Sequence, residues 1–424
     1  MRKLLLSLTL FLVCIPLSAD TNNSPFVAIP IENYPFIDLK HNEIRIPSED
    51  STVFRDFFDQ VNDLITRKDR QINVLHIGGS HVQADMFSHK VRSNLDVINA
   101  QFGSPRGFIF PFSAAKTNNP FNYRVTYSGE WNAVRNVQAN REIALGMGGI
   151  AVYTNDITAK IHIDLNPNRG ETGIRWTLER LRLLGYPEDE YSLIYPVLLY
   201  QGDTIRSFYD LITDTYVFEL PEEVDSFELG FTSTEEEPGI FIVNGFIPEK
   251  DVPGIIYHAI GVNGASTESF LNVEYFEKEL SIIMPDLVIF GIGINDAANN
   301  DFSPELFHAR YTELLRRIRE INPNCAFLFL TNNDSFKRLS RNNYRVNQNV
   351  IPAQEVFYRL ARETGGGVWD LFELMGGLSS MARWEKAGLA QKDKIHFKKE
   401  GYELLGDLLF NALLRLYYEM EGDN

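Results

Sequence analysis

The sequence predicts an α/β domain that is interrupted by an inserted all-β domain. Three observations lead to this prediction. An apolar strand pattern at 72–77 is followed by two glycines and then by a helical pattern. From about 123 to 247 the chain changes to short β-like runs separated by Gly, Pro, Asn and Asp turns. After Pro253 strands and helices alternate again, as they do in a parallel sheet covered by helices.

The first α/β unit is expected to begin with a helix over 51–67. Apolar residues recur there at helical spacing, and Ser51 fits the N-cap position. A strand over 72–77 follows, and a second helical pattern runs through 86–98. This strand–turn–helix order is typical of the start of an α/β domain.

The middle of the chain is expected to form a β-sandwich of the jelly-roll type, with at most one helix. The predicted strands lie at 123–127, 150–153, 160–165, 193–200, 216–220, 227–231 and 240–243. The second α/β part has predicted strands at 255–260, 287–294, 326–330 and 368–371. Its predicted helices lie at 270–282, 306–321, 356–363 and 402–418.

These patterns divide the chain into five segments. They are a signal peptide over 1–19, an N-terminal extension over 20–50, the first part of the α/β domain over 51–115, the inserted β-sandwich over 116–250 and the second α/β part over 251–424.

The N-terminal residues are typical of a secretory signal peptide. Arg2 and Lys3 precede an apolar run over 4–17, and the small residues Ser18 and Ala19 follow it. A run of this length is too short to span a bilayer, which needs about 20 residues. We therefore expect cleavage near Ala19 and an exported product, either periplasmic or secreted. The alternative is a buried N-terminal helix.

The composition excludes several classes of partner. Forty Lys and Arg face fifty-seven Asp and Glu, which gives a formal net charge of -17. This excess of negative charge repels nucleic-acid phosphates and anionic membrane surfaces. Beyond the expected signal peptide the chain has one cysteine, Cys325, which excludes an internal disulfide and is interpreted as a buried structural thiol. The composition assigns no oligomeric state.

Two glycine-rich turns follow predicted strands. In the first, Ser80 stands directly after Gly78 and Gly79, where a strand-to-helix turn would expose its hydroxyl beside a helix N-terminus. The alternative is a capping box, because Gln83 follows Ser80 at the required spacing. In the second turn, Gly264 would allow a backbone N–H to approach a ligand closely, and the alternative is a simple turn.

Two further clusters come later in the chain. Asn295 follows the most apolar predicted strand, and ligands of open α/β sheets bind at such strand ends. The alternative is a turn in which Asn295 only begins the next element. Asp393 and His396 stand just before the last helix. Three-residue spacing can bring the carboxylate to one imidazole nitrogen and leave the other free to take a serine proton. The alternative is a solvated pair at a helix start.

The order and spacing of these four clusters resemble the SGNH hydrolases, also called the GDSL esterase family. The resemblance implies a flavodoxin-like three-layer α/β/α fold, with Ser80 as nucleophile, His396 as general base and Asp393 as its orienting partner. It also implies an oxyanion hole formed by the Ser80 and Gly264 backbone N–H groups and the Asn295 amide. The chain departs from the family at Gly79, where an aspartate is usual.

A narrower resemblance is to the bacterial O-acetylpeptidoglycan esterases. It is carried by the continuation Ser80 to Asp85, the turn Asn263-Gly264-Ala265 and the stretch over 375–393. Those enzymes carry an inserted β-sandwich resembling a carbohydrate-binding module. The resemblance implies an exported esterase that removes O-acetyl groups from a carbohydrate polymer, with peptidoglycan as first choice and other acetylated glycans as second.

No metal or organic cofactor is expected. His76, His81 and His89 match no common zinc spacing, and the chain has no phosphate-binding Gly-rich motif. Three alternatives stay open: a lipid-directed acylhydrolase of the same fold, a glycan-binding protein with a degenerate catalytic domain, and acetyl transfer to a sugar acceptor.

Overall fold

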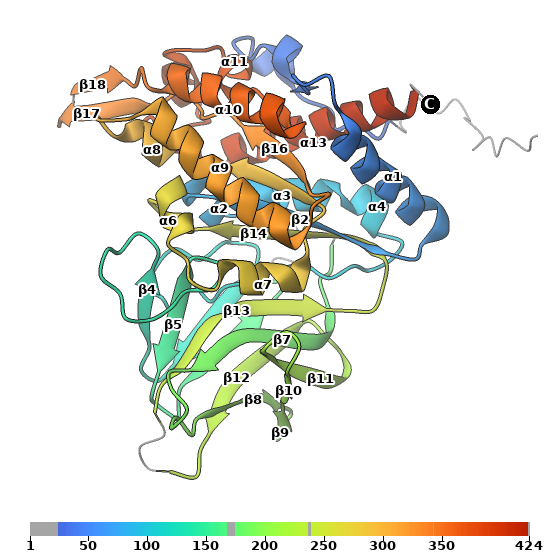
Figure 1. The fold of residues 1–424 in the computed structure, drawn as a ribbon, viewed down its shortest axis with the longest axis vertical. Coiled ribbons are helices and arrows are strands. Elements are labelled where there is room, and N and C mark those ends of the chain that lie inside the picture. The colour runs from blue at the N-terminus through green and yellow to red at the C-terminus, as the bar shows by residue number, and fades with distance from the viewer. Residues whose placement is uncertain (1–23, 168–173, 236–238, 342, 423–424) are drawn as a thin grey trace, which may run out of the picture.

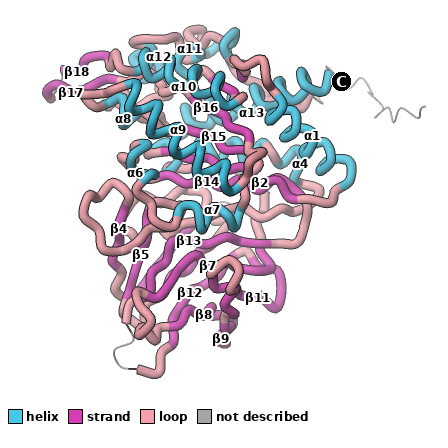
Figure 2. The backbone as a smooth tube through the Cα atoms, viewed as in Figure 1, coloured by secondary structure: helices cyan, strands magenta, loops and turns pink. Residues whose placement is uncertain are grey.

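The computed structural model describes residues 24–167, 174–235, 239–341 and 343–422. The signal peptide expected over 1–19 lies outside these residues. The elements form a helix-rich α/β body and an all-β body beneath it in the view of Figure 1. Figure 2 shows the same division, with helices concentrated around one sheet and the other body formed by strands and loops.

The α/β body is built on a six-stranded sheet in the order β1-β19-β16-β15-β2-β14. Five of these strands are parallel: β2 (Gln71–Gly78), β14 (Gly254–Gly261), β15 (Leu287–Gly291), β16 (Ala326–Leu330) and β19 (Gly367–Trp369). In chain order they are arranged 2-1-3-4-5, which is the flavodoxin-like order. The predicted fold class is therefore confirmed. The short strand β1 (Ile44–Arg45) adds an antiparallel edge beside β19.

Helices cover both faces of this sheet. Along β15 the side chains of Leu287 and Ile289 pack into one hydrophobic core, and those of Val288 and Phe290 pack into another. The first core includes α1 (Thr52–Arg67), α3 (Met86–Asn94) and α13 (Lys399–Gly422). The second includes α7 (Phe276–Ile283), α9 (Pro304–Ile321) and α10 (Val350–Thr364). Burial on both faces explains why the central strands are continuously apolar rather than alternating.

The shorter elements connect the layers. They are η1 (Ile31–Asn33), η2 (Leu39–His41), α2 (Ser80–Gln83), α4 (Asp96–Asn99), α6 (Thr267–Leu271), α8 (Ile294–Ala298), α11 (Leu371–Leu374), α12 (Ser380–Lys386) and the hairpin β17 (Phe336–Ser340) and β18 (Asn343–Val346). Several predicted elements differ from the structure in their bounds, and two of them have a local cause. The helix expected over 270–282 is divided into α6 and α7, because a capping box at Ser266 starts α6 early and α6 ends at Leu271, with Asn272 as its C-cap. The strand expected over 287–294 ends at Gly291, and α8 begins three residues later.

The all-β body consists of two antiparallel sheets, ordered β10-β11-β7-β13-β5-β4 and β3-β6-β12-β8-β9. The strands are β3 (Arg124–Ser128), β4 (Asn132–Arg135), β5 (Ile150–Thr154), β6 (Lys160–Asp164), β7 (Leu178–Pro187), β8 (Tyr195–Tyr200), β9 (Asp203–Arg206), β10 (Phe208–Asp210), β11 (Thr215–Val224), β12 (Ser226–Thr232) and β13 (Phe241–Glu249). The sequence allows one helix here, but the described residues of this body contain only strands and loops. Strand β7 lies between β11 and β13, where pairing on both sides favours the extended form.

The all-β body shares its hydrophobic core with the α/β body. Val152, Leu181 and Phe218 from the strands belong to the same cluster as Val288 of the central sheet and Phe307 of α9. The two bodies therefore do not have separate interiors, and removal of the β strands would expose apolar surface on the α/β body. In the described part of the chain, no helix combines the length and the apolar character that a membrane span requires.

A buried carboxyl group joins the two bodies. Glu279 of α7 accepts hydrogen bonds from the Met147 N–H at 2.8 Å and from the Asn244 amide at 2.8 Å. Burial raises the pKa of Glu279 to about 7, although both hydrogen bonds favour the ionised form. The ordinary pKa of this carboxyl is 4.5, so it is protonated more readily in the folded than in the unfolded chain. Between pH 4.5 and about 7, folding therefore takes up a proton.

This raised pKa predicts a loss of stability as the pH rises. The contribution of Glu279 is fully present below its ordinary pKa of 4.5 and is lost as the pH passes through about 7. The free energy of unfolding can be measured with denaturant from pH 4 to 8 for wild type and for Glu279→Gln. Across this window it should fall for wild type relative to Glu279→Gln. Parallel curves for the two proteins would contradict the prediction.

Candidate active site

The ends of three neighbouring strands bring the predicted site residues together. Ser80 follows β2, Gly264 follows β14 and Asn295 follows β15, and β2 lies between the other two strands in the sheet. All three strands are parallel, so their carboxyl ends meet at one edge of the sheet. His396 and Asp393 reach this edge from the loop that precedes α13.

Ser80, His396 and Asp393 form a continuous hydrogen-bonded chain. The Ser80 Oγ lies 2.8 Å from His396 Nε2, and His396 Nδ1 lies 2.7 Å from Asp393 Oδ2. The second oxygen of Asp393 accepts the backbone N–H groups of Ile395 and His396, which fixes the bend. Burial raises the pKa of Asp393, but the His396 ring and these N–H groups outweigh it and lower the pKa to about 2. The carboxylate is therefore charged at neutral pH and can fix the His396 tautomer.

The side chain of Ser80 does not act as a helix cap. The N-cap residue of α2 is Gly79, and no side-chain capping bond is made there. The Ser80 hydroxyl is instead directed to His396. Its position at the first residue of α2 also places its backbone N–H among the unpaired donors of a helix start. The geometry thus favours the nucleophile interpretation over the capping box.

The other two predicted donors lie next to this turn. Gly264 has φ +84°, a left-handed conformation that glycine adopts without strain. Asn295 Nδ2 donates to the Ala265 carbonyl at 2.8 Å, which ties the end of β15 to the Gly264 turn. A side chain at Gly79 would place its Cβ 3.2 Å from Asn295 Nδ2, so the serine turn also approaches Asn295 closely.

Gly79 is the position at which the chain departs from the usual family pattern. Its φ of -94° lies outside the left-handed region, so a left-handed backbone does not account for the glycine. The close Cβ contact nevertheless requires the Asn295 amide to move, and a carboxylate there would compete for the same donor. We predict that Gly79→Ala lowers kcat severalfold and that Gly79→Asp lowers it further. Steady-state kinetics on p-nitrophenyl acetate test this, and a Gly79→Asp protein faster than wild type would contradict it.

Gln83, which the sequence offered as part of a capping box and of the continuation Ser80 to Asp85, belongs to the site. It is 1% exposed, and its Oε1 accepts the Asn263 N–H at 2.7 Å. Its Nε2 donates to Asn118 Oδ1 at 3.1 Å and to Thr117 Oγ1 at 3.2 Å. Gln83 therefore holds the Gly264 turn against the helix that carries Ser80. The sequence shows that Gln83 lies one helical turn after Ser80. It does not show that Gln83 binds Asn263, which is 180 positions away.

Gln83→Ala is predicted to disorder the Gly264 turn and to lower kcat by about 10-fold, with a smaller effect on KM, because a preorganised donor is lost. Gln83→Glu keeps the acceptor for the Asn263 N–H and should recover part of kcat. A purely structural role would lower the melting temperature without this rescue. Equal kcat values for wild type and Gln83→Ala would show that the turn does not need this bond.

Three buried histidines near the site are held neutral. Burial lowers the pKa of His76, His81 and His89 to about 3 in each case. His81 Nδ1 lies 2.7 Å from the Tyr402 hydroxyl, and its ring lies 5.4 Å from that of His396. A neutral His81 places no like charge beside His396 when that ring takes up a proton. Among the described residues, no three His, Cys, Asp or Glu side chains are grouped so that they could hold a metal ion.

Comparison with known proteins agrees with this fold. Residues 246–404 match the model of the GDSL-like Lipase/Acylhydrolase family. A solved structure described as "Peptidoglycan O-acetylesterase in action, 5 min" is similar over 89% of this chain and 99% of its own, with a TM-score of 0.69 and 19% identity. No curated protein sequence matches the chain.

Two other solved structures are less similar to this chain. An acetyl xylan esterase, AlAXEase, is similar over 37% of this chain and 81% of its own, with a TM-score of 0.31 and 15% identity. A family two carbohydrate esterase from Cellvibrio japonicus covers 70% of this chain and all of its own, with a TM-score of 0.29 and 9% identity. The family match and the fold together support a carboxylic ester hydrolase with an SGNH-type α/β domain and additional β sheets.

Proposed function

We propose that this GDSL-type acylhydrolase removes O-acetyl groups from a carbohydrate polymer outside the cytoplasm, with O-acetylated peptidoglycan as the first-choice substrate. The hydrogen-bonded chain Ser80–His396–Asp393 is the observation that carries the proposal. A serine within hydrogen-bonding distance of an oriented imidazole is the arrangement that acyl transfer requires. The N-terminal signal-like sequence supports the export part of the proposal.

The reaction follows from these positions. His396 Nε2 takes the Ser80 proton as Oγ attacks the acetyl carbonyl. The carbonyl oxygen then develops negative charge, which the Ser80 and Gly264 N–H groups and the Asn295 amide would stabilise. His396 returns the proton to the sugar oxygen, the C–O bond breaks, and an acetyl-enzyme remains. Water activated by the same imidazole releases acetate and restores Ser80.

The polarity of the surroundings favours a sugar ester over a lipid ester. The hollow that begins at Gly264 is lined mainly by amide, hydroxyl and charged side chains, including Asn136, Ser266 and Asn272. A long acyl chain is bound best by an apolar wall. The hydrogen-bonded triad likewise gives no support to a degenerate, binding-only protein.

Acetate release from purified O-acetylated peptidoglycan tests the proposal. Wild-type protein should release acetate, and the same polymer deacetylated beforehand with mild base should give none. A parallel series of p-nitrophenyl esters should show acetate hydrolysed faster than octanoate or longer esters. A preference for long chains, or no acetate release from any acetylated glycan, would overturn the proposal.

A further inference from the structure

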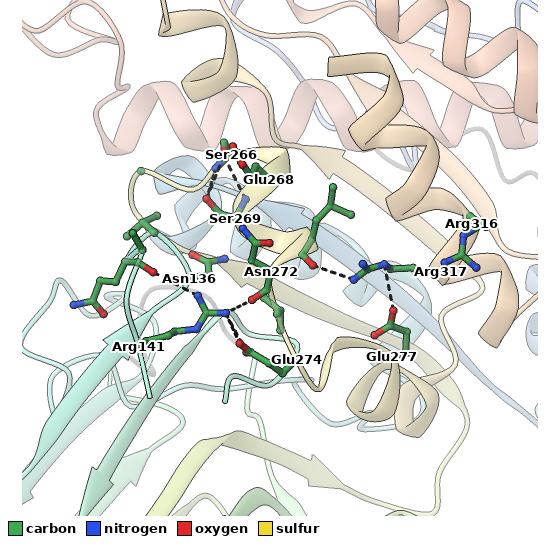
Figure 3. Close-up of a pocket in the computed structure, with 16 residues that line it drawn as sticks. Asn136, Arg141, Ser266, Glu268, Ser269, Asn272, Glu274, Glu277, Arg316 and Arg317 are labelled. Carbon is green, nitrogen blue, oxygen red and sulfur yellow. Dashed lines mark hydrogen bonds and ion pairs between the residues drawn. The ribbon is translucent and has the colours of Figure 1, made fainter. Parts of the chain in front are cut away.

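A large hollow lies where the two bodies meet beside the candidate active site. Its volume is about 990 Å³, near the upper end of the range for small-molecule sites. One wall is the loop over 136–141, which follows β4 of the all-β body. The other wall comes from the α/β body, from Gly264 through α6 to α7 and across to α9. Figure 3 shows Arg141 of the loop joined to Asn272 and Glu274 of the other wall, with Glu277, Arg316 and Arg317 farther to the right.

The groove adjoins the candidate acyl-transfer site through one shared residue. Gly264 contributes both to the turn assigned to the oxyanion hole and to the groove wall. Val137 of the opposite loop comes within 3.9 Å of the position that a Cβ on Gly264 would occupy. A polymer with its ester at Ser80 would therefore meet the loop of the all-β body within a short distance of the reacting carbonyl.

The loop is held in this position by an ion pair between a mostly buried arginine and an exposed glutamate. The Arg141 side chain is 8% exposed and pairs with Glu274 at 2.8 Å. It also donates to the Asn272 carbonyl, while Glu274 accepts the Leu145 N–H at 3.0 Å. These contacts join the loop to the segment between α6 and α7. The wall is consequently preorganised, which lowers the entropy cost of binding a ligand there.

The lining has the chemistry of a site for a neutral, hydroxyl-rich chain. Amides and hydroxyls come from both walls: Asn136, Gln138, Asn272, Ser266 and Ser269. Three arginines are balanced by three glutamates, so the groove carries no net formal charge. The lining contains no aromatic ring, so recognition would depend on hydrogen bonds rather than on stacking.

Asn136 provides an additional sign of a ligand. Its side chain is 4% exposed, and neither atom of its amide has a hydrogen-bond partner among the described residues. Buried amides in native proteins are nearly always paired. Asn136 also lines the groove, so a bridging water can connect its unpaired amide to a sugar hydroxyl.

We propose that this interdomain groove binds the sugar units that flank the acetylated residue, so that the all-β body recognises the polymer through its 136–141 loop. This inference rests on the proposed function and adds the location and chemistry of the polymer subsite. It differs from glycan binding on the outer face of the sandwich, where a second hollow of about 350 Å³ is lined by Tyr200 and Glu228. Strands β8 and β12, which carry these residues, lie at the end of the molecule away from the central sheet (Figure 1).

Substitutions on the two walls test the groove. Asn272→Ala removes an exposed amide from one wall. Gln138→Glu replaces an amide of the other wall with a carboxylate, which can still accept the 2.7 Å hydrogen bond from the Arg135 N–H. Each should lower kcat/KM for polymeric substrate about 5- to 10-fold more than kcat/KM for p-nitrophenyl acetate, mainly through KM, because a hydrogen bond to the polymer is lost. Tyr200→Ala is the matched control and should leave polymer hydrolysis at the wild-type rate.

Hydrogen exchange gives a readout that does not depend on these variants. Peptidoglycan glycan strands without their O-acetyl groups are added to wild-type protein. They should protect the backbone amides over 136–141 and 266–277 from exchange. Protection confined to 195–228 would contradict binding in the groove and favour the outer face of the sandwich. So would slow polymer hydrolysis by Tyr200→Ala together with wild-type rates for Asn272→Ala and Gln138→Glu. Failure of wild type to release acetate would overturn the proposed function itself, so the two failures are distinguishable.

Discussion

Ser80→Ala and His396→Ala should each lower kcat for ester hydrolysis by about 10⁴- to 10⁶-fold, the loss typical of removing one member of a catalytic triad. The expected effect is large because the 2.8 Å contact between Ser80 Oγ and His396 Nε2 is the only route in the proposed mechanism by which the nucleophile loses its proton. Steady-state hydrolysis of p-nitrophenyl acetate measures it. Ser281→Ala, which changes an exposed serine of α7, is the matched control.

The double variant should be little slower than either single variant, since the two residues act as a unit. Asp393→Ala should cost less, because the imidazole can still act as a base when its tautomer is no longer fixed. A Ser80→Ala protein that hydrolyses the ester at the wild-type rate would contradict the assignment of the nucleophile.

Asn295→Ala should lower kcat by about 10²- to 10³-fold, the cost of removing one preorganised oxyanion donor. In this chain the same substitution also removes the bond to the Ala265 carbonyl, which ties Asn295 to the Gly264 turn. The loss should therefore appear in kcat with little change in KM, since the donor acts mainly on the transition state. Asn295→Asp keeps the size of the side chain but replaces the donor with a negative charge, and it should be at least as slow.

An effect confined to KM would instead identify Asn295 as a residue that binds the ground-state substrate. The melting temperatures of both variants provide the control for folding. A stable Asn295→Ala protein with wild-type kcat would remove Asn295 from the oxyanion hole.

Local patterns in the sequence were enough to predict the α/β class and the additional all-β body, whereas the flavodoxin-like sheet was implied by the resemblance to the SGNH hydrolases. Strand β16 (Ala326–Leu330) was predicted to the residue, because a short continuous apolar run between polar turns has few alternatives in a doubly covered sheet. The boundaries of α6 and α7 were predicted less well. An apolar pattern that continues through Asn272 does not reveal that the helix is interrupted there.

The residues expected to do the chemistry could also be named from the sequence, because turns and strand ends are local features. Their signal came from the order of Ser80, Gly264, Asn295 and His396 along the chain. The structure adds the distances that relate the triad members. Ser80 and His396 are 316 positions apart, and no local pattern can state that their side chains touch.

The sequence by itself therefore determined the element types, the strand-end positions of the candidate site and the presence of an inserted β-rich segment, because hydrophobic periodicity and turn chemistry act over a few residues. Only the tertiary structure decided that β2 lies between β14 and β15, that Gln83 holds the Asn263 N–H, and that the 136–141 loop forms a wall beside Gly264. Each of these depends on contacts between distant segments. Such contacts are selected by the packing of the whole core, which the all-β and α/β bodies share.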